Sequence, residues 1–186
     1  MLASRSSIRL PAGTRISAVR LLPAHVAAVG LHFGFKALGA CFNHTGYDLQ
    51  VKFLGIDYSE VAVALAANVG QKRGLSQVRF CHADATRLED LEERFGLVLD
   101  KGTFDAYMLG AAASVDRYAA SVLAALKPGG VFVITTCNST ADEVAALFTA
   151  RGFVERDRVP YPTFEFGGRK GAAVATVALV ARSGGA

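Results

Sequence analysis

The sequence has 186 residues, of which 52% are hydrophobic and 19% charged, and its formal net charge is +4. This length and composition predict one globular domain with a single core, and they exclude a disordered chain and a pair of full-sized domains. No apolar run is long enough to span a membrane. The three cysteines and four histidines follow no ligand spacing, so we expect neither a disulfide framework nor a metal site.

The positive charge is concentrated at the N-terminus, because the residues before Asp48 carry five basic side chains and no acidic one. The basic pI is therefore no argument for nucleic-acid binding by the rest of the chain. The opening is similar in composition to a mitochondrial presequence, whereas Pro11, Gly13 and Pro23 favour an irregular tail. We assign residues 1–50 to an atypical basic N-terminal segment and residues 51–182 to the domain.

Strand and helix patterns alternate from residue 51 onward. The apolar run 51–56 predicts a buried strand, and 59 to about 72 a helix that ends at Gly74 and has Val61, Leu65 and Val69 on one face. A second strand is predicted at 78–82, and a short acidic helix or turn in "RLEDLEERFG".

The second half continues this alternation and then changes. "LVLDKG" predicts a third strand that ends in Asp100, residues 114–127 a helix terminated by "KPGG", and 131–136 a fourth strand. Thr140 and Glu143 form a capping box for a helix through residue 150. The runs 153–159 and 172–181 predict an antiparallel pair of strands.

This pattern predicts the α/β class, with a mostly parallel, doubly wound sheet and an antiparallel C-terminal strand pair. Ligands of such sheets bind at the carboxyl ends of the strands, where Asp57, Asp84 and Asp100 are expected in register. Asp57 would accept hydrogen bonds from ribose hydroxyls, and Tyr58 would cover an adenine face. Asp84 and the N–H of Ala85 would recognise the adenine edge. The alternatives are helix capping for Asp57, packing for Tyr58 and a turn for Asp84.

The motifs "GIDYS", "ADAT", "LDKGTFDA", "LKPGG", "TTCN" and "FEFGGRKG" resemble, in this order, the class I (seven-β-strand) S-adenosylmethionine-dependent methyltransferases. They are most similar to the protein-lysine methyltransferases that modify elongation factor 1-alpha. The resemblance covers residues 55–181 and implies a Rossmann-like fold and S-adenosyl-L-methionine as cofactor.

The resemblance also assigns roles to individual residues. It implies that Asp57, Tyr58, Asp84, Ala85 and Asp100 bind the cofactor. The residues where cofactor and target lysine meet would be Asp100, Lys101 and Asp105, with Asp100 and Asp105 holding the amine. The "DKGTFD" turn could equally be held together by Asp105 and Lys101. On the substrate side the resemblance places Thr103, Phe104, Asn138, Phe166 and Arg169.

The sequence departs from this family upstream of "GIDYS". Members carry a first strand that ends in an acid and a glycine-rich D-x-G-x-G-x-G turn, whereas this chain has "GLHFGFKALGACFNHTG", without an acid or a G-x-G. Two explanations compete. Residues 26–33 serve as a surrogate first strand, or residues 1 to about 50 are an alternative exon that leaves the sheet without its central strand. The coincidence with the change in charge favours the second.

The implied reaction is methyl transfer to the neutral amine of a lysine. A catalytically impaired methyltransferase-fold protein is the alternative that the missing turn favours. A nicotinamide-dependent oxidoreductase would need a G-x-G-x-x-G turn, and a nucleic-acid methyltransferase often has an Asn/Asp-Pro-Pro-aromatic tetrad where "DKGT" stands. The resemblance implies a monomer in the cytoplasm, with the nucleus as a further location, acting on elongation factor 1-alpha without nucleic acid or membrane.

Overall fold

The computed structural model describes residues 52–162, 164–166 and 169–182, together with three short strands nearer the N-terminus at 9–10, 14–15 and 26–29. Side chains are described for residues 52–162 and 172–182. No helix in this part of the chain is long and apolar enough to cross a membrane.

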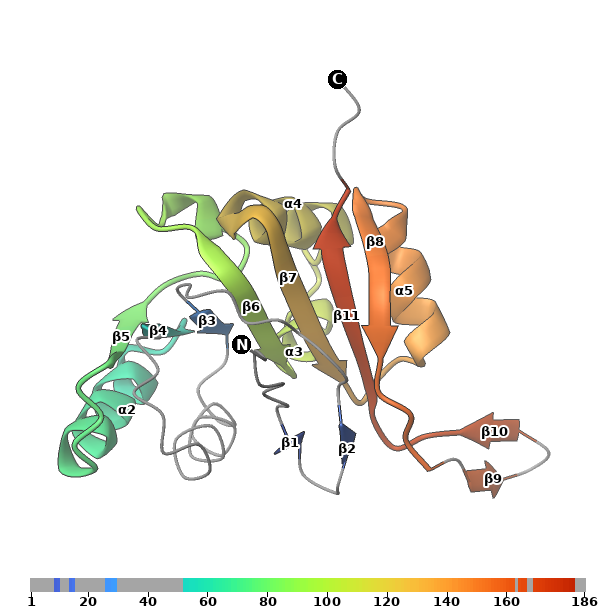
Figure 1. Ribbon diagram of the computed structural model, residues 1–186, viewed down its shortest axis with the longest axis horizontal. Coiled ribbons are helices and arrows are strands. Elements are labelled where there is room, and N and C mark those ends of the chain that lie inside the picture. The colour runs from blue at the N-terminus through green and yellow to red at the C-terminus, as the bar shows by residue number, and fades with distance from the viewer. Residues whose placement is uncertain are drawn as a thin grey trace, which may run out of the picture.

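Seven strands form one sheet in the order β5-β4-β3-β6-β7-β11-β8 (Figure 1). Strands β3 to β7 are parallel, and β11 is antiparallel to both β7 and β8. The expected mostly parallel sheet with an antiparallel C-terminal pair is therefore confirmed. The strands are β3 (Val26–Val29), β4 (Phe53–Asp57), β5 (Val78–His82), β6 (Phe95–Lys101), β7 (Leu126–Thr136), β8 (Phe153–Arg158) and β11 (Ala175–Ala181).

The first strand of the fold is present. Strand β3 lies between β4 and β6 and pairs with both in parallel, Val29 facing Ile56 on one side and Asp100 on the other. The surrogate strand that the sequence offered is therefore present, and the expectation of a sheet without its central strand is wrong. The origin of residues 1 to about 50 as an alternative exon stays a prediction. An apolar "VAAV" run suits this position, because a central parallel strand is buried on both faces.

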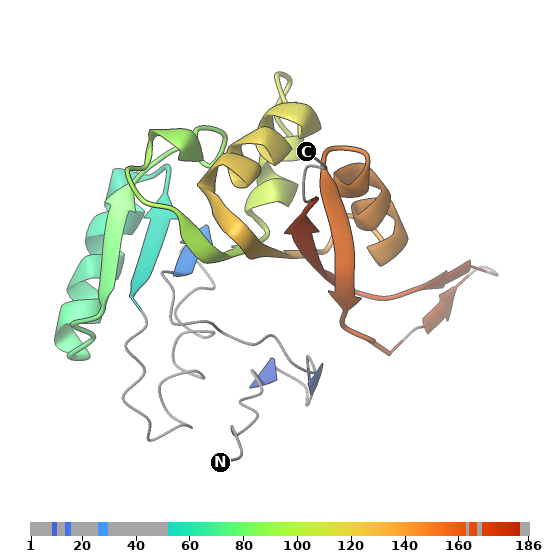
Figure 2. The same ribbon diagram turned by 45° about the horizontal axis from the view of Figure 1, so that its top comes forward.

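Helices cover both faces of the sheet. Residues facing one another in a parallel ladder share a face, so Phe53, Phe80 and Leu97 lie on one face and Ile56, Val98 and Ile134 on the other. Helix α2 (Glu60–Lys72) packs on the face of Phe80. Helices α3 (Thr103–Met108), α4 (Val115–Ala125) and α5 (Ala141–Thr149) lie together on the opposite face (Figure 2).

Helix α2 begins at its predicted residues but packs with a different side. Ser59 caps it by accepting a hydrogen bond from Ala62 N–H. Its buried residues are Ala66 and Gly70, where an added Cβ would lie 3.1 Å from the Phe80 ring. Val61 and Leu65, on the face that the sequence singles out, are 79% and 64% exposed. The large ring of Phe80 requires small residues on the helix, so small residues form the contact.

The turn "LKPGG" differs from its prediction because helix α4 ends at Ala125 and β7 begins directly at Leu126. Gly129 has a φ of 72°, which favours glycine. A Cβ on Gly130 would lie 2.8 Å from the carbonyl oxygen of Lys127. Both glycines are therefore needed for the chain to turn and enter the sheet here.

The C-terminal part contains the predicted capping box and one additional hairpin. Thr140 and Glu143 cap α5 reciprocally. Between β8 and β11, strands β9 (Phe164–Phe166) and β10 (Arg169–Gly171) pair with each other and leave the body at the edge where β6 and β7 end (Figure 1). Near the N-terminus, β1 (Arg9–Leu10) and β2 (Thr14–Arg15) form a separate antiparallel pair.

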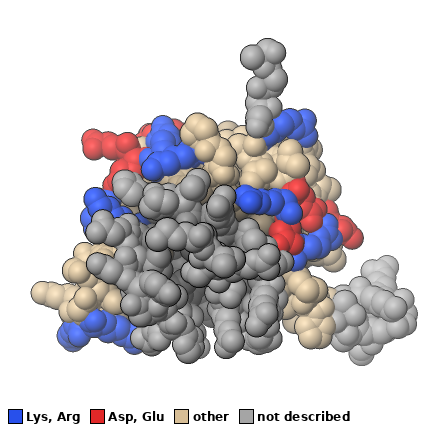
Figure 3. Space-filling view, viewed as in Figure 1, with Lys and Arg blue, Asp and Glu red and all other residues tan. Residues whose placement is uncertain are grey.

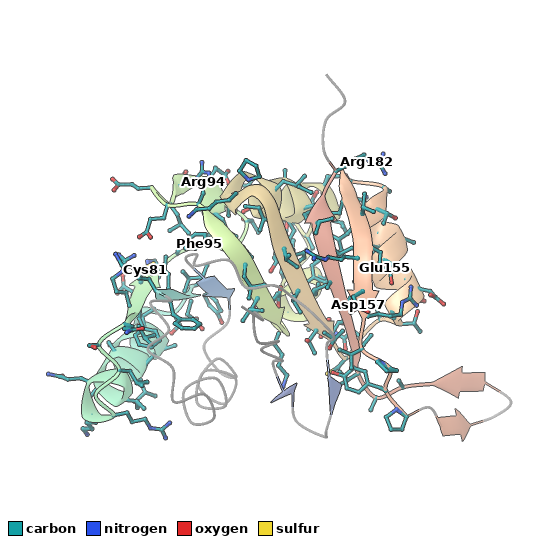
Figure 4. The ribbon with its side chains drawn as sticks, in the orientation of Figure 1. Cys81, Arg94, Phe95, Glu155, Asp157 and Arg182 are labelled. Atoms are coloured by element: carbon teal, nitrogen blue, oxygen red, sulfur yellow. The ribbon has the colours of Figure 1, made fainter. Side chains whose placement is uncertain are left out.

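Strand β8 forms one edge of the sheet and is highly charged. Arg158 contacts both Glu155 on its own strand and Asp142 on α5. Acidic and basic side chains lie beside one another over β8 and α5 in Figure 3, and Figure 4 labels Glu155 and Asp157 on this strand. Charges of this kind protect an edge strand against pairing with other chains.

Candidate functional site

The strand order fixes where a ligand would bind. From β3 the chain builds the sheet outward through β4 and β5, and it then crosses to β6 on the other side of β3. The topological switch point therefore lies between β3 and β6, at their carboxyl ends, and ligands of open α/β sheets bind outside such a point. Figure 4 labels Arg94 and Phe95 near the opposite, amino end of β6.

Asp57 is the last residue of β4 and lies half-buried at this edge. Its Oδ1 accepts a hydrogen bond of 2.9 Å from the N–H of Ser59, the residue that caps α2. The capping role considered from the sequence is thus indirect, because Ser59 itself caps the helix. The next residue, Tyr58, is 81% exposed, so the alternative that its ring is packed in the interior is wrong.

The ends of β4 and β5 are connected. Asp57 faces His82 in the ladder, and its carbonyl oxygen accepts a hydrogen bond of 3.0 Å from Ala83 N–H. His82 Nε2 lies 2.9 Å from the carbonyl oxygen of Tyr58. These contacts hold the loop with Asp84 and Ala85 beside Asp57, as the sequence predicts for a nucleoside site.

Asp84 forms a turn with Thr86. Its Oδ1 accepts hydrogen bonds of 2.8 Å from both the N–H and the hydroxyl of Thr86. The side chain is exposed, and its Oδ2 has no partner among the residues that the structure describes. The N–H of Ala85 likewise has no acceptor there, while its carbonyl oxygen accepts from Ser121. The turn and the adenine-binding role are therefore compatible, because different atoms serve each.

Asp100, in contrast, points into the interior and is 2% exposed. Its carboxylate accepts hydrogen bonds from the N–H of Thr103 at 3.0 Å, from the N–H of Phe104 at 3.1 Å and from the hydroxyl of Tyr118. The three strand-end acids are therefore not in register as the sequence predicted, because Asp100 is level with Ile56 and not with Asp57.

Burial raises the pKa of the Asp100 carboxyl to about 6, and the hydrogen bonds from Tyr118, Thr103 and Phe104 oppose this shift. The negative charge of Asp105 adds to the rise. Burial also raises the pKa of Tyr118, and the charge of Asp100 raises it further. Tyr118 therefore stays protonated and donates to Asp100 at neutral pH.

Asp105 connects α3 with the end of β7. Its Oδ1 accepts from the hydroxyl of Thr136 and its Oδ2 accepts at 2.8 Å from the N–H of Cys137. The contact between Asp105 and Lys101 that the sequence offered as an alternative is not recorded in the described part of the chain. Both acids considered for holding the amine, Asp100 and Asp105, thus use both carboxylate oxygens within the protein.

The remaining predicted residues divide into three groups. Lys101 and Asn138 are exposed and Thr103 is half-exposed at the carboxyl edge. Phe104 is 3% exposed and packs edge-to-face on Tyr118, so its predicted place on the substrate side is wrong. Phe166 and Arg169 lie in the β9–β10 hairpin, and their side chains are outside the described residues.

Two residues at this site carried no recognisable sequence signal. Tyr118 and Ser121 look like ordinary polar positions of an amphipathic helix, yet they are 0% and 2% exposed. Each forms a hydrogen bond with a loop at the carboxyl edge, Tyr118 through Asp100 and Ser121 through Ala85 and Leu88. A buried polar residue needs such a partner, but its partner is distant in the sequence.

Comparison with known proteins agrees with this geometry. Residues 39–163 match the methyltransferase domain family. The chain is 38% identical over 140 residues to the protein-lysine N-methyltransferase EFM4 of Saccharomyces cerevisiae, an alignment that covers 72% of this chain and 61% of the relative. It is 37% identical over 126 residues to EEF1A lysine methyltransferase 2 of Homo sapiens, covering 66% of this chain and 53% of that protein.

The structure also resembles that of an S-adenosylmethionine-dependent methyltransferase from Clostridium acetobutylicum, with a TM-score of 0.64, 12% identity and coverage of 86% and 84% of the two chains. This similarity shows a Rossmann-like class I fold. The chain spans between about half and three fifths of the length of the two curated relatives. Because the family match covers residues 39–163, most of the sheet and its carboxyl edge included, the chain belongs to the methyltransferase domain family.

Proposed function

We propose that the protein is an S-adenosylmethionine-dependent protein-lysine N-methyltransferase that acts on elongation factor 1-alpha. The observation that carries this proposal is the pair of loops that places Asp57 and Asp84 together beside the switch point of a methyltransferase fold. The names of the relatives at 37% and 38% identity support the lysine target and the elongation factor.

The residues present fit the nucleoside half of the cofactor. A carboxylate at the end of β4 accepts hydrogen bonds from vicinal hydroxyls. The Oδ2 of Asp84 and the N–H of Ala85, neither of which has a partner among the described residues, offer one acceptor and one donor for an adenine edge. The residues that follow β3, where the methionine half would lie, are outside the described residues.

The bound cofactor supplies an electrophilic methyl group, and the protein has to present a neutral lysine amine to it. Desolvation lowers the pKa of a lysine and supplies the neutral form. In this chain the loop 101–103 borders the place of reaction. Its backbone is held from the interior side by Asp100, which accepts hydrogen bonds from the N–H groups of Thr103 and Phe104. The protein therefore contributes orientation of the amine, and Asp100 contributes as a positioning residue.

The partner follows from the same proposal. The substrate is a folded protein, so the exposed carboxyl edge with Lys101 and Asn138, together with the β9–β10 hairpin beside it, is the face that we assign to substrate binding. We further propose that the chain acts as a monomer, in the cytoplasm and without nucleic acid.

A second candidate is a methyltransferase-fold protein with impaired catalysis. The sequence around residues 30–46 has no acid and no G-x-G, although such a turn allows the backbone to approach the cofactor closely. This candidate predicts a folded chain that binds the cofactor weakly or not at all.

Calorimetry with S-adenosylmethionine separates the two candidates. We expect micromolar affinity for the 186-residue chain, about 30-fold weaker binding in Asp57→Ala, and unchanged binding in Asp157→Ala, an acid on the distant edge strand β8. Methylation of purified elongation factor 1-alpha, read by mass spectrometry of its lysines, then tests the substrate. A folded chain without affinity for the cofactor would favour the impaired protein.

A further inference from the structure

Helix α4 presents two buried polar side chains to the carboxyl edge of the sheet. Tyr118 and Ser121 are three residues apart, so they lie on the same face of the helix, one turn from each other. They are 0% and 2% exposed. Neither contacts the place where substrate or cofactor would bind, and each reaches a different loop.

Tyr118 holds the loop at the end of β6. Its hydroxyl donates to Asp100, which accepts in turn from the N–H groups of Thr103 and Phe104. The ring of Tyr118 packs against the rings of Phe104 at 5.2 Å and Tyr107 at 5.5 Å. Gly102, between the strand and α3, has a φ of 78°, so the loop turns sharply and depends on these contacts for its direction.

Ser121 holds the loop after β5. Its hydroxyl donates to the carbonyl oxygen of Ala85 at 2.9 Å and accepts from the N–H of Leu88 at 2.7 Å. These two bonds fix both ends of the segment 85–88, whose first residue carries the N–H that we assign to adenine. The side chain of Leu88 is 1% exposed and anchors the segment from below.

We propose that Tyr118 and Ser121 are positioning residues, which place the methionine half and the adenine half of the cofactor site through Asp100 and the segment 85–88 respectively. This inference rests on the proposed function. One helix thereby sets the distance between the two loops, since both contacts come from the same face of α4.

The contact between Tyr118 and Asp100 makes the methionine half of the cofactor site sensitive to pH. Protonation of Asp100 removes the charge from its hydrogen bonds and places a proton where Tyr118 donates. Among the described residues, the titratable groups that interact with Asp100 are Tyr118 on α4 and Asp105 on α3, and Lys101 is next to it on its own strand. Strand β7 presents only the uncharged Ile134 opposite it.

Two ligands distinguish the methionine half of the site from the adenine half. S-adenosylhomocysteine carries both the nucleoside and the amino-acid part, whereas adenosine carries the nucleoside alone. Loss of the Tyr118 hydroxyl should weaken only the first ligand, and loss of the Ser121 hydroxyl should weaken both. A general loss of packing or stability would instead weaken the binding of both ligands to the same extent.

The experiment compares three variants with the unaltered chain by calorimetry at pH 6.5 and pH 8.5. Tyr118→Phe should lower the affinity for S-adenosylhomocysteine about tenfold at pH 6.5 and about threefold at pH 8.5, with adenosine within about twofold. Ser121→Ala should lower both affinities about fivefold at both pH values. Tyr107→Phe is the matched control, because its hydroxyl contacts Ser114 and not Asp100.

A second readout does not need a ligand. Carbon-13 labelling of aspartate carboxyls follows the titration of Asp100 by NMR, with Asp100→Asn for assignment. We expect a midpoint near pH 6 in the unaltered chain, a higher one in Tyr118→Phe, because the Tyr118 hydrogen bond lowers this pKa, and no change in Tyr107→Phe.

The outcomes separate this inference from the proposed function. If the folded, unaltered chain binds neither ligand, the proposed function fails and the positioning roles fail with it. If the unaltered chain binds but Tyr118→Phe weakens both ligands equally, or shifts neither the pH dependence nor the Asp100 titration, only the role of Tyr118 is refuted. Equal effects of Ser121→Ala and Tyr107→Phe on adenosine would refute the role of Ser121.

Discussion

The ends of strands β4 and β6 look alike in the sequence, since each is an apolar run followed by an aspartate, but the two acids face different surroundings. Val29 of β3 faces Ile56 on one side and Asp100 on the other, so Asp57 lies one residue further toward the edge than Asp100. Successive residues of a strand point to opposite faces. A difference of one residue therefore turns Asp100 toward α4 and the core, and leaves Asp57 beside the proposed ligand.

Asp100→Ala tests this difference most strongly. The substitution leaves two backbone N–H groups and the Tyr118 hydroxyl without their acceptor in the interior. We expect the free energy of unfolding at pH 7 to fall by about 4 kcal/mol. Urea unfolding measures it. A loss below about 1 kcal/mol would mean that Asp100 is not part of the core.

The second-largest effect is expected in the pH dependence of stability, which should distinguish Asp100 from Asp57. The folded state raises the pKa of Asp100 from 3.8 to about 6, so it binds a proton that the unfolded chain has already lost. The proton-linked part of the Asp100 contribution to stability is thus complete below pH 4 and is lost as the pH rises through about 6, a change of about 3 kcal/mol. The hydrogen bonds that Asp100→Ala removes remain above that pH. The stability difference between the unaltered chain and Asp100→Asn, measured across this range, should show this slope.

Asp57→Ala should have the opposite effect to Asp100→Ala: it should weaken cofactor binding and leave the stability of the fold nearly unchanged. Loss of a carboxylate that accepts from two ribose hydroxyls is expected to weaken S-adenosylmethionine about 30-fold, or about 2 kcal/mol. Thermal unfolding should change little, because Asp57 is only half-buried. If the substitution instead unfolded the protein, the contrast between the two strand ends would be lost.

Asp84→Ala is expected to have the smallest effect. It removes one acceptor for adenine and the Thr86 turn, and we expect about fivefold weaker binding of adenosine. Asp84→Asn is the control for the alanine variant, because its side-chain oxygen can still accept the hydrogen bonds from Thr86. Equal binding by the alanine variant and the unaltered chain would remove Asp84 from the site.

Much of the fold follows from local sequence signals. Strand β5 occupies its predicted residues, the capping box of α5 is present, and Ser59 begins α2. These elements were predictable because their signals lie within a few neighbouring residues. The antiparallel pairing of the C-terminal strands was equally predictable, since two β-rich runs separated by a Pro- and Gly-containing connection favour it.

The features that were not predictable depend on residues far apart in the chain. The register between β3 and β6 decides the surroundings of Asp100, and no pattern within either strand specifies it. The packing face of α2 is set by Phe80 on the next strand. The contacts of Tyr118 and Ser121 join α4 to residues 18 and 36 positions upstream. Site residues could therefore be named from the sequence, but their orientation could not.

Strand β3 has a consequence for how the protein opens. It is the only strand that connects the pair β5-β4 with the four strands β6-β7-β11-β8 in the described sheet. It is four residues long, whereas the four-stranded part carries most of the large buried side chains. Amide hydrogen exchange should therefore divide the protein into two cooperative units, with slow exchange in β6, β7 and β11 and faster exchange in β4 and β5. Such a division would place Asp57, at the end of β4, and Asp100, on β6, in units that unfold separately.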